Sequence, residues 1–390
     1  MPGGACQPLR VGLVSTAPED GVGSMSLYAR LVSLALDRAA GVEAAPIRLA
    51  TGPRFLRPGP KALGGRLGHV SKAIGAVRSF FGPRVDLYHI LDGSHAYVAP
   101  LLPRKPLVVT CHDLIPLLQL EGRLGGAPPS RLGAWLVRRS AAALRRAHAV
   151  VAVSERSRRD AAEVAGAPVA RLAVAHNPAP PRLVEWAAAQ GRLAWPQRRQ
   201  AEPYVLHVGN DAFYKNRPVV LRVFARLAAA PELRLKMAGA PPEDGLRGLC
   251  AGLGVAGRVD FIPSPSEEQL WRLYRGAALF LFPSLYEGFG WPPLEAMLLD
   301  CPVVCSNAAS LPEVAGGAAL MAAPDDVDAL ARLCRRVLDD AGVAGALIEA
   351  GRRQAARFTM ERFAAGLLAA YEMALGRPRG SLGGAVEAVA

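Results

Sequence analysis

The sequence has few cysteines, few aromatic side chains and no long apolar run. Its 390 residues include six cysteines without a Cys-x-x-Cys pair, which argues against a zinc site and, at this length, against a disulfide framework. No apolar run reaches the roughly 18 residues that a membrane span needs. The first residues lack a basic region, and their apolar run ends before Glu19 and Asp20, which indicates a β-strand rather than a signal peptide. We therefore expect a cytoplasmic protein with buried thiols.

Acidic residues are also scarce relative to basic ones. The chain has 46 Lys and Arg against 33 Asp and Glu, a formal net charge of +13. Two explanations of this positive charge are open. Either arginine is simply favoured on solvated faces as a matter of composition, or the protein binds an anionic membrane or an anionic substrate. Nucleic acid is not expected, because the basic residues are not interleaved with exposed aromatics. A helical pattern in "LVRRSAAALRRAHA" suits a helix on acidic lipid, and its basic residues are Arg138, Arg139, Arg145 and Arg146.

Short apolar or β-branched runs alternate with helical patterns along the chain. This alternation predicts parallel sheets covered by helices, and the length suits two domains. The fold class is therefore α/β, with two doubly wound Rossmann-like domains that face a deep shared cleft, where ligands bind at the carboxyl ends of the strands. The expected strands are 9–15, 85–91, 106–113, 148–154, 170–177, 204–210, 233–239, 258–264, 278–284, 302–308 and 318–323.

The domain boundary is expected within residues 178–203, which are rich in Pro, Arg and Gln and have no strand pattern. The expected parts are an N-terminal Rossmann-like domain, a linker, a C-terminal Rossmann-like domain, a helix that crosses back to the first domain, and a tail. Their ranges are 1–180, 181–203, 204–355, 356–378 and 379–390.

The segment "LFPSLYEGFGWPPLEAM" places two glutamates, Glu287 and Glu295, in a connection between a strand and a helix. Its glycines permit close backbone approach or positive φ, and its prolines suit the first turn of the helix. The N–H groups of the helix start form an anion site beside both carboxylates. A nucleotide sugar fits this combination, because its diphosphate accepts hydrogen bonds and its hydroxyls donate them. A loop glutamate and a capping glutamate without any ligand are the alternative.

"PSLYEGFGWPPLEAM", followed by "CPVVCSNAASLPEVAGGAALMAAP", resembles the signature of family 4 glycosyltransferases, which are retaining enzymes of GT-B fold with a Glu-x7-Glu motif. The resemblance is strong over about 204–340 and looser over 9–177. It implies a metal-independent enzyme that needs no cofactor and takes a nucleotide-diphosphate sugar as donor. By this resemblance, Glu287 contacts the donor sugar and Glu295 the ribose.

The same resemblance assigns backbone contacts around the two glutamates. Amides of Gly288, Phe289 and Gly290 would face the sugar, and those near Pro293 and Leu294 the phosphates. Asp300 stands where the family usually has glycine. Because aspartate tolerates left-handed backbone better than most residues, we expect little damage from this departure.

Lys215, in "VGNDAFYKNRP", aligns with the family lysine that neutralises the donor diphosphate; a solvated loop lysine is the alternative. The point charge of a lysine suits a leaving group that gains negative charge. Gly209 and Asn210 precede it as donor-binding candidates. The family often has an arginine in this stretch, but Asn210 and Tyr214 occupy those places here, and Arg217 is only a weak substitute.

His112 and Asp113 follow the strand "PLVVTC". The tripeptide "HDL" resembles that of bacterial mannosyl- and rhamnosyl-transferring members, in which the histidine approaches the donor sugar. We expect His112 to act at the site and Asp113 to orient the acceptor, the alternative being a structural histidine. Gly21 and Gly23 form a loop that, in the family, closes over the diphosphate and acceptor; a plain turn is the alternative.

These assignments imply transfer of a hexose or deoxyhexose, with mannose or rhamnose favoured, and with retention of configuration. The acceptor would be a saccharide or a polyprenyl-diphosphate-linked saccharide in cell-surface polysaccharide assembly, and the basic helices favour a peripheral position on the inner face of the plasma membrane. The alternatives are glycosylation of a soluble natural product, a nucleotide-sugar 2-epimerase, and a non-catalytic nucleotide-sugar-binding protein.

Overall fold

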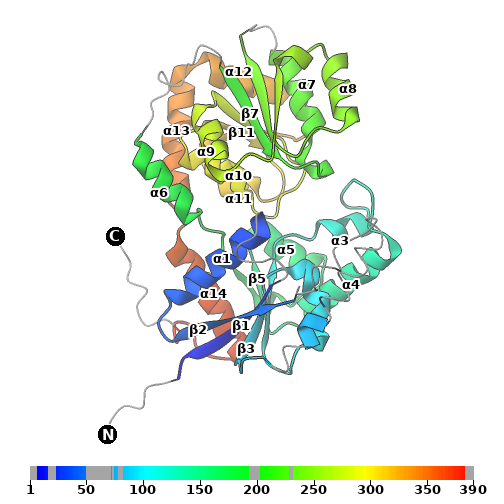
Figure 1. Cartoon of the computed structure of the whole chain (residues 1–390), viewed down its shortest axis with the longest axis vertical. Helices are drawn as coiled ribbons and strands as arrows, with labels where there is room; N and C mark the ends of the chain where they lie inside the picture. The colour runs from blue at the N-terminus through cyan, green and yellow to red at the C-terminus, as the bar shows by residue number, and fades with distance from the viewer. Residues whose placement is uncertain are drawn as a thin grey trace. The chain divides into compact units, whose positions relative to one another are not determined.

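The computed structural model describes residues 7–15, 23–49, 72, 74–77, 82–192, 203–227 and 232–382. The chain forms two compact units, seen in Figure 1. Unit 1 comprises Met1–Pro178 and Thr359–Ala390, and unit 2 comprises Ala179–Phe358. Each unit contains one six-stranded sheet, and all strand pairs are parallel. The predicted α/β class with two Rossmann-like units is therefore confirmed.

Unit 1 has the strand order β2-β1-β3-β4-β5-β6. Two of its inner strands, Leu87–Ile90 and Ala149–Ala152, are wholly buried, as expected of a parallel sheet with helices on both faces. The strands are β1 (Leu9–Ser15), β2 (Val42–Arg48), β3 (Leu87–Ile90), β4 (Leu107–Cys111), β5 (Ala149–Ala152) and β6 (Leu172–Val174). The helices are α1 (Ser24–Asp37), η3 (Gly93–Leu101), α3 (Ile115–Leu120), α4 (Arg131–Arg146), α5 (Glu155–Glu163), η4 (Val169–Arg171) and α14 (Met360–Leu375).

Unit 2 has the strand order β12-β11-β10-β7-β8-β9. The strands are β7 (Tyr204–Gly209), β8 (Arg234–Gly239), β9 (Val259–Pro263), β10 (Leu279–Phe282), β11 (Val303–Ser306) and β12 (Ala319–Ala322). The helices are α6 (Pro181–Gln190), η6 (Phe213–Lys215), α7 (Arg217–Leu227), α8 (Asp244–Gly252), η7 (Ala256–Arg258), α9 (Glu267–Gly276), α10 (Trp291–Leu298), α11 (Leu311–Ala315), η8 (Gly316–Ala318), α12 (Val327–Asp339) and α13 (Ala341–Ala355).

The order of strands in unit 2 changes direction between β7 and β10. From β7 the chain builds outward through β8 and β9, and it then returns to place β10, β11 and β12 on the other side. At such a switch point the connections after the two neighbouring strands diverge, which leaves a crevice at the carboxyl edge of the sheet where ligands bind. The segments after β7 and β10 contain Lys215 and Glu287.

Each predicted strand range contains a strand, but strand β2 lies outside all of these ranges. Its sequence, "VEAAPIR", contains two alanines and Pro46, all poor in strand propensity. Because β2 is the edge strand, only one side must form a hydrogen-bonded ladder, and a proline is tolerated. The range 181–203, expected as a linker, begins with helix α6, which lies against α10.

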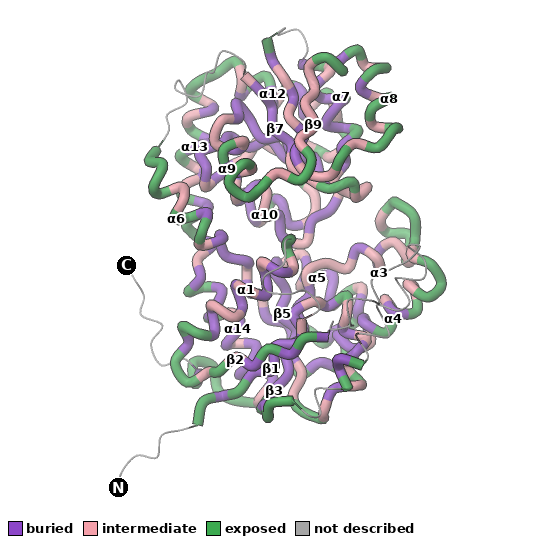
Figure 2. The backbone as a smooth tube through the Cα atoms, viewed as in Figure 1, coloured by how far each residue is buried: buried purple, intermediate pink, exposed green. Residues whose placement is uncertain are grey.

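Buried residues follow the central strands of each unit, as Figure 2 shows. In unit 2 the core includes Phe224, Leu281 and Val304, and in unit 1 it includes Ile90, Val109 and Val150. Five cysteines are free and buried, as expected of small apolar side chains, and Cys6 lies outside the described residues. Within the described ranges, no helix combines the length and apolar character needed to cross a bilayer.

Candidate active site

Lys215 and Glu287 form an ion pair at the switch point of unit 2. Lys215 ends η6 after β7, and Glu287 lies in the loop after β10. The Lys215 Nζ atom lies 2.8 Å from Glu287 Oε1 and 3.1 Å from Oε2. The side chains are only 13% and 10% exposed, so water screens the pair less than a surface ion pair. The structure thus brings together two of the predicted residues.

Hydrogen bonds to backbone carbonyls link the two loops. Asn216 adopts a left-handed conformation with a φ of 55°, and its side-chain Nδ2 donates to the carbonyls of Pro283 (3.0 Å) and Pro324 (2.8 Å). The N–H of Leu285 donates to the carbonyl of Tyr214 at 2.8 Å. These hydrogen bonds therefore fix the backbone on both sides of Lys215.

Ser310 fixes the backbone of the loop that carries Glu287. The Ser310 hydroxyl is shared between the carbonyls of Glu287 (2.9 Å) and Phe289 (2.6 Å). Gly290 has a φ of 109°, and a Cβ there would lie 2.9 Å from Leu311 Cδ2. The predicted positive φ is therefore confirmed at Gly290.

Helix α10 begins directly after Gly290, with prolines in its first turn as predicted. The first four N–H groups of a helix have no partner within the helix, but prolines carry none. Pro292 and Pro293 therefore remove two of the expected donors, and Pro293 itself cannot donate to a phosphate. Leu294 is the first residue after them that carries an N–H group. The anion site predicted at this helix start therefore has fewer N–H donors than a helix start without prolines.

Glu295 lies in the second turn of α10. Part of its surface is accessible, but the carboxyl is deep enough in unit 2 that lost hydration dominates its ionisation. Burial raises its pKa to about 7; the nearby Tyr274 hydroxyl and Lys215 oppose this shift, and Glu267 adds to it. The Tyr274 hydroxyl has no partner of good hydrogen-bond geometry among the described residues, so its effect on Glu295 is one of proximity.

Asp300, where the family usually has glycine, has a φ of 58°. Its tolerance of left-handed backbone is therefore confirmed. The carboxylate also accepts a hydrogen bond from Arg352 Nε at 2.7 Å, so the aspartate provides a contact that glycine could not. Arg352 in turn pairs with Glu349 on α13.

His112 follows β4 in unit 1 with its ring orientation fixed. The ring Nε2 lies 2.8 Å from the carbonyl of Leu91, and the Tyr28 ring meets it edge-on at a centroid distance of 4.5 Å. Because a carbonyl only accepts, Nε2 carries the proton and Nδ1 is left as an acceptor. Asp113 Oδ1 accepts from the N–H of Ile115 at 3.1 Å, at the start of α3.

The glycine and asparagine candidates have local structural roles. Gly23 is the N-cap of α1, with a φ of 115°, and Gly21 lies outside the described residues. Gly209 ends β7. The Asn210 side chain accepts from the N–H of Ala212 at 3.1 Å, which closes a turn before η6. The positions of Gly23 and Gly209 and the hydrogen bond of Asn210 do not by themselves indicate a ligand.

A polar cluster that was not predicted lies after β3, next to the switch point of unit 1. The Asp92 carboxylate accepts from Nδ1 of His95 at 2.9 Å, and Lys72 Nζ lies 2.6 Å from the Nε2 of that ring. Burial alone would raise the pKa of Asp92, but the hydrogen bond and charge of His95 outweigh it and hold the pKa well below its usual range. The sequence does carry a signal for this cluster. An aspartate directly follows a predicted strand, and a histidine stands three residues after it.

His207, which was not predicted as a site residue, lies in β7, just before the loop that carries Lys215. Its Nδ1 lies 3.0 Å from the carbonyl of Leu281, and burial lowers its pKa to about 3, so the ring is neutral. A Cβ at Gly209 would lie 3.2 Å from the ring Nε2. Within the described residues, no group of three His, Cys, Asp or Glu side chains is placed to hold a metal ion.

Two Rossmann-like units, each built on a sheet of six parallel strands, define an α/β protein of GT-B type. The structure is similar to that of a sucrose-phosphate synthase from Thermosynechococcus elongatus, with a TM-score of 0.73 and 21% identity. The alignment covers 94% of this chain and 99% of that one. At this identity the likeness concerns the fold alone.

Sequence comparisons give the family. The profile described as "Glycosyltransferase Family 4" matches residues 28–182, and that described as "Glycosyl transferases group 1" matches residues 194–354. The chain belongs to family 4 of the glycosyltransferases, as its motif predicts.

Two curated relatives come from Escherichia coli. The chain is 34% identical to O-antigen chain mannosyltransferase B over 47% of each chain. It is 29% identical to the serotype-specific mannosyltransferase WbdA, over 75% of this chain and 36% of that one. The chain therefore matches less than half the length of either relative.

Proposed function

We propose that the chain is a retaining hexosyltransferase that moves mannose, or a related hexose or deoxyhexose, from a nucleotide-diphosphate sugar to a saccharide or lipid-linked acceptor in cell-surface polysaccharide assembly. The observation that carries this proposal is the Lys215–Glu287 pair at the carboxyl ends of β7 and β10. Membership of family 4 supports the class of reaction. The names of the two relatives favour mannose.

The proposed roles follow from the chemistry of each group. Glu287 accepts hydrogen bonds from hydroxyls of the donor sugar. The Lys215 ammonium has three donors, so it can hold Glu287 and a phosphate oxygen together and offset the charge that develops on the departing diphosphate. Glu295 accepts from the ribose hydroxyls. We expect neither a metal ion nor a further cofactor in the reaction.

His112 is proposed to accept a hydrogen bond from a sugar hydroxyl. Its Nε2 proton is committed to the carbonyl of Leu91, so only Nδ1 can receive a ligand hydroxyl while the ring is neutral. The acceptor hydroxyl is proposed to lose its proton to the leaving phosphate, in a front-face substitution with retention. The protein then mainly orients the two substrates.

The substitution Glu287→Gln tests the proposal. Without this carboxylate the sugar loses an acceptor, and we expect transfer to fall roughly a hundredfold. Nucleoside diphosphate affinity should stay unchanged or rise, because Lys215 is released to the phosphates. Calorimetry with GDP-mannose, dTDP-rhamnose, UDP-glucose and UDP-GlcNAc measures binding, and turnover with lipid extract measures transfer. Glu268→Gln, on the exposed face of α9, is the matched control.

Binding results separate this function from its rivals. If no nucleotide sugar binds the native chain, the transferase assignment fails. Interconversion of the sugar without any acceptor would instead identify an epimerase, and binding without turnover a non-catalytic protein. Transfer to a soluble aglycone but not to lipid extract would favour natural-product glycosylation. An equal loss of nucleoside diphosphate affinity in Glu287→Gln would contradict the role given to that residue.

A peripheral membrane contact through helix α4 is proposed in addition. Trp135 and Leu132 are 52% and 42% exposed, and the Arg139 guanidinium lies 5.0 Å over the Trp135 ring. Exposed arginines beside exposed apolar side chains suit an interfacial helix on anionic lipid. The other exposed arginines of α4 are Arg131, Arg138, Arg145 and Arg146.

Vesicle sedimentation tests this membrane contact. Each arginine near an anionic surface contributes about 1 kcal/mol, so the pair Arg138→Gln and Arg139→Gln should lower affinity for phosphatidylglycerol vesicles roughly tenfold or more. Phosphatidylcholine vesicles and the control Arg222→Gln, an exposed position on α7, should show no such loss. Equal binding of the native chain to both lipids would refute an electrostatic contact.

A further inference from the structure

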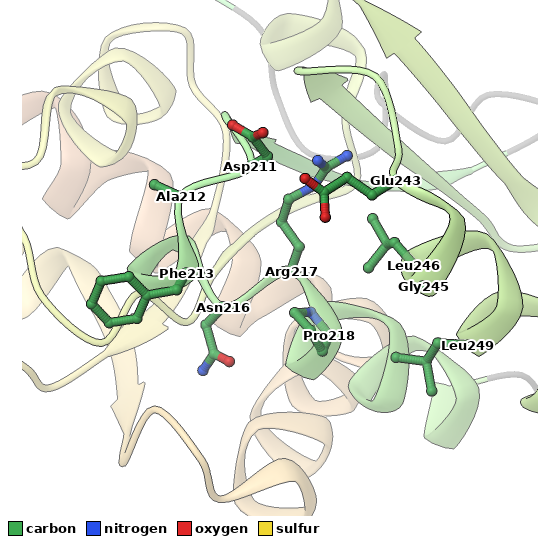
Figure 3. A pocket seen from close by; sticks show the side chains of 10 residues that line it. All are labelled: Asp211, Ala212, Phe213, Asn216, Arg217, Pro218, Glu243, Gly245, Leu246 and Leu249. Atoms are coloured by element: carbon green, nitrogen blue, oxygen red, sulfur yellow. The ribbon is translucent and has the colours of Figure 1, made fainter. Parts of the chain in front are cut away.

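A pocket of about 360 Å³ lies beside the Lys215 loop in unit 2. That volume is within the range of small-molecule sites. One wall is the segment after β7 with the start of α7, and the other is the start of α8. The lining residues are Asp211, Ala212, Phe213, Asn216, Arg217, Pro218, Glu243, Gly245, Leu246 and Leu249, as Figure 3 shows.

Arg217, the first residue of α7, contributes a buried charge to this pocket. The residue is only 6% exposed. One guanidinium nitrogen, Nη2, donates to the carbonyl of Ala240 at 3.1 Å, but the buried Nε has no partner among the described residues. A buried charged donor without an acceptor is costly, and such groups are rare without a specific reason. Because this Nε is itself covered, a bound anion would meet the guanidinium on the side that faces the pocket.

The surroundings of Arg217 add further positive potential. Helices α7 and α8 both begin at the pocket, and the start of a helix carries the positive end of its dipole. The lysine that pairs with Glu287 lies two residues earlier in the chain, but its Nζ is turned toward Glu287. Arg217 therefore provides a positive charge that this ion pair does not neutralise.

Two carboxylates flank the guanidinium without pairing with it. Asp211 and Glu243 are exposed, and their side chains lie near that of Arg217 (Figure 3). Both act on its charge, yet neither is within the 4.0 Å of an ion pair in the described part of the chain. Carboxylates accept hydrogen bonds and repel a bare anion. A ligand that satisfies all three side chains therefore needs an anionic group together with hydroxyl donors.

We propose that this pocket binds a phosphorylated sugar, with the phosphate on Arg217 and the sugar hydroxyls on Asp211 and Glu243. The ligand is a free sugar phosphate and not the donor nucleotide, whose ribose is proposed above to contact Glu295. The proposal does not depend on the transfer reaction, because it rests on the pocket and on Arg217 alone.

Calorimetry on the full chain with ribose 5-phosphate as the probe tests the site. Arg217→Gln keeps an amide donor for the Ala240 carbonyl but removes the charge, and it should weaken binding roughly tenfold or more. Arg222→Gln makes the same change on the exposed face of the same helix, so it should bind as the native chain does. The site is refuted if the native chain does not bind ribose 5-phosphate, or if Arg217→Gln binds it equally well.

A second variant keeps the test valid should Arg217→Gln fail to fold. Replacing both exposed carboxylates, by Asp211→Asn with Glu243→Gln, removes repulsion toward anions but retains Arg217. Inorganic phosphate should then bind as tightly as before or more tightly, while the preference for ribose 5-phosphate over phosphate is lost. An unchanged preference would show that the hydroxyls do not meet these carboxylates.

Competition with GDP tests whether this site is separate from the nucleotide site. If GDP displaces ribose 5-phosphate and Arg217→Gln weakens the binding of both, the pocket belongs to the nucleotide site and the proposal is refuted. If GDP and ribose 5-phosphate bind at the same time, and Arg217→Gln weakens only the binding of ribose 5-phosphate, the pocket is a separate sugar-phosphate site. Either result is independent of turnover, so a failure to transfer any sugar would leave the site intact.

Discussion

Burial raises the pKa of Glu295 to about 7, so this carboxyl changes its charge within the physiological range. A ribose hydroxyl donates more strongly to a carboxylate than to a neutral acid. Nucleoside diphosphate affinity should therefore rise between pH 6 and pH 8, roughly severalfold. Calorimetry at these two pH values measures the change. In Glu295→Gln the group no longer titrates, and the part of the increase that belongs to Glu295 should disappear.

The stability of the folded chain provides the control for this titration. Because the pKa of Glu295 is higher in the folded chain than its usual value of 4.5, the folded state binds this proton more tightly than the unfolded state. Its contribution to stability is complete below about pH 4.5 and is lost as the pH rises through about 7. The loss of Tm from pH 5 to pH 8 should be smaller in Glu295→Gln. An equal loss in both chains would mean that Glu295 ionises normally.

For single residues, the sequence shows which side chains belong to the site better than it shows which of them contact each other. Lys215 and Glu287 were both expected at the site, but they are 72 residues apart, and only the strand order shows that they meet. The tolerance of Asp300 for left-handed backbone follows from its chemistry alone. The buried, unpartnered Nε of Arg217 could not be predicted, because burial of a long charged side chain depends on how two loops pack around it.

At the scale of secondary structure elements, strands β7 and β8 approach closely where they end. Gly239 has a φ of 132°, and a Cβ there would lie 2.1 Å from the carbonyl oxygen of Gly209. Because the clash is with backbone, it cannot be relieved by a side-chain rotation. Gly239→Ala should destabilise unit 2 by about 2 kcal/mol or more, as measured by chemical denaturation of the full chain.

Gly248→Ala is the matched control for this strand contact. Gly248 lies inside helix α8, and a Cβ there would meet no atom within 4 Å. Alanine favours a helix over glycine by about 1 kcal/mol, so this variant should be as stable as the native chain or more stable. A native-like midpoint for Gly239→Ala would show that β7 and β8 can separate at little cost.

Elements were predictable where local patterns agree with burial. The wholly buried strand β10 reads as an uninterrupted apolar run, and the prolines at the start of α10 mark that helix. Strand β2 was missed because an edge position tolerates a proline that argues against a strand elsewhere. The prolines that mark the start of α10 also remove N–H donors there, so the predicted anion site has fewer donors than a helix start without prolines.

At the scale of the whole molecule, unit 1 is completed by the end of the chain. Helix α14 belongs to unit 1 and packs against α1, β4, β5 and β6. It contributes the fully buried side chains of Phe363, Leu367 and Tyr371. The Tyr371 hydroxyl lies 2.9 Å from Nδ1 of the buried His89. Unit 1 therefore depends on two segments that are distant in the sequence, whereas unit 2 is one continuous segment.

Removal of residues 359–390 should therefore unfold unit 1 and leave unit 2 folded. Burial of each large apolar side chain contributes about 1.5–3 kcal/mol, so the loss of α14 removes an amount comparable to the stability of a whole domain, about 5–15 kcal/mol. Hydrogen exchange read by mass spectrometry should show protection lost in β3, β4 and β5 but kept in β7 and β10. Nucleoside diphosphate binding through Lys215 should persist in the shortened chain. A chain that ends at Leu382 keeps every described contact of α14 and should match the native pattern. Retained protection in β4 and β5 without α14 would show that this helix covers unit 1 without being needed to stabilise it.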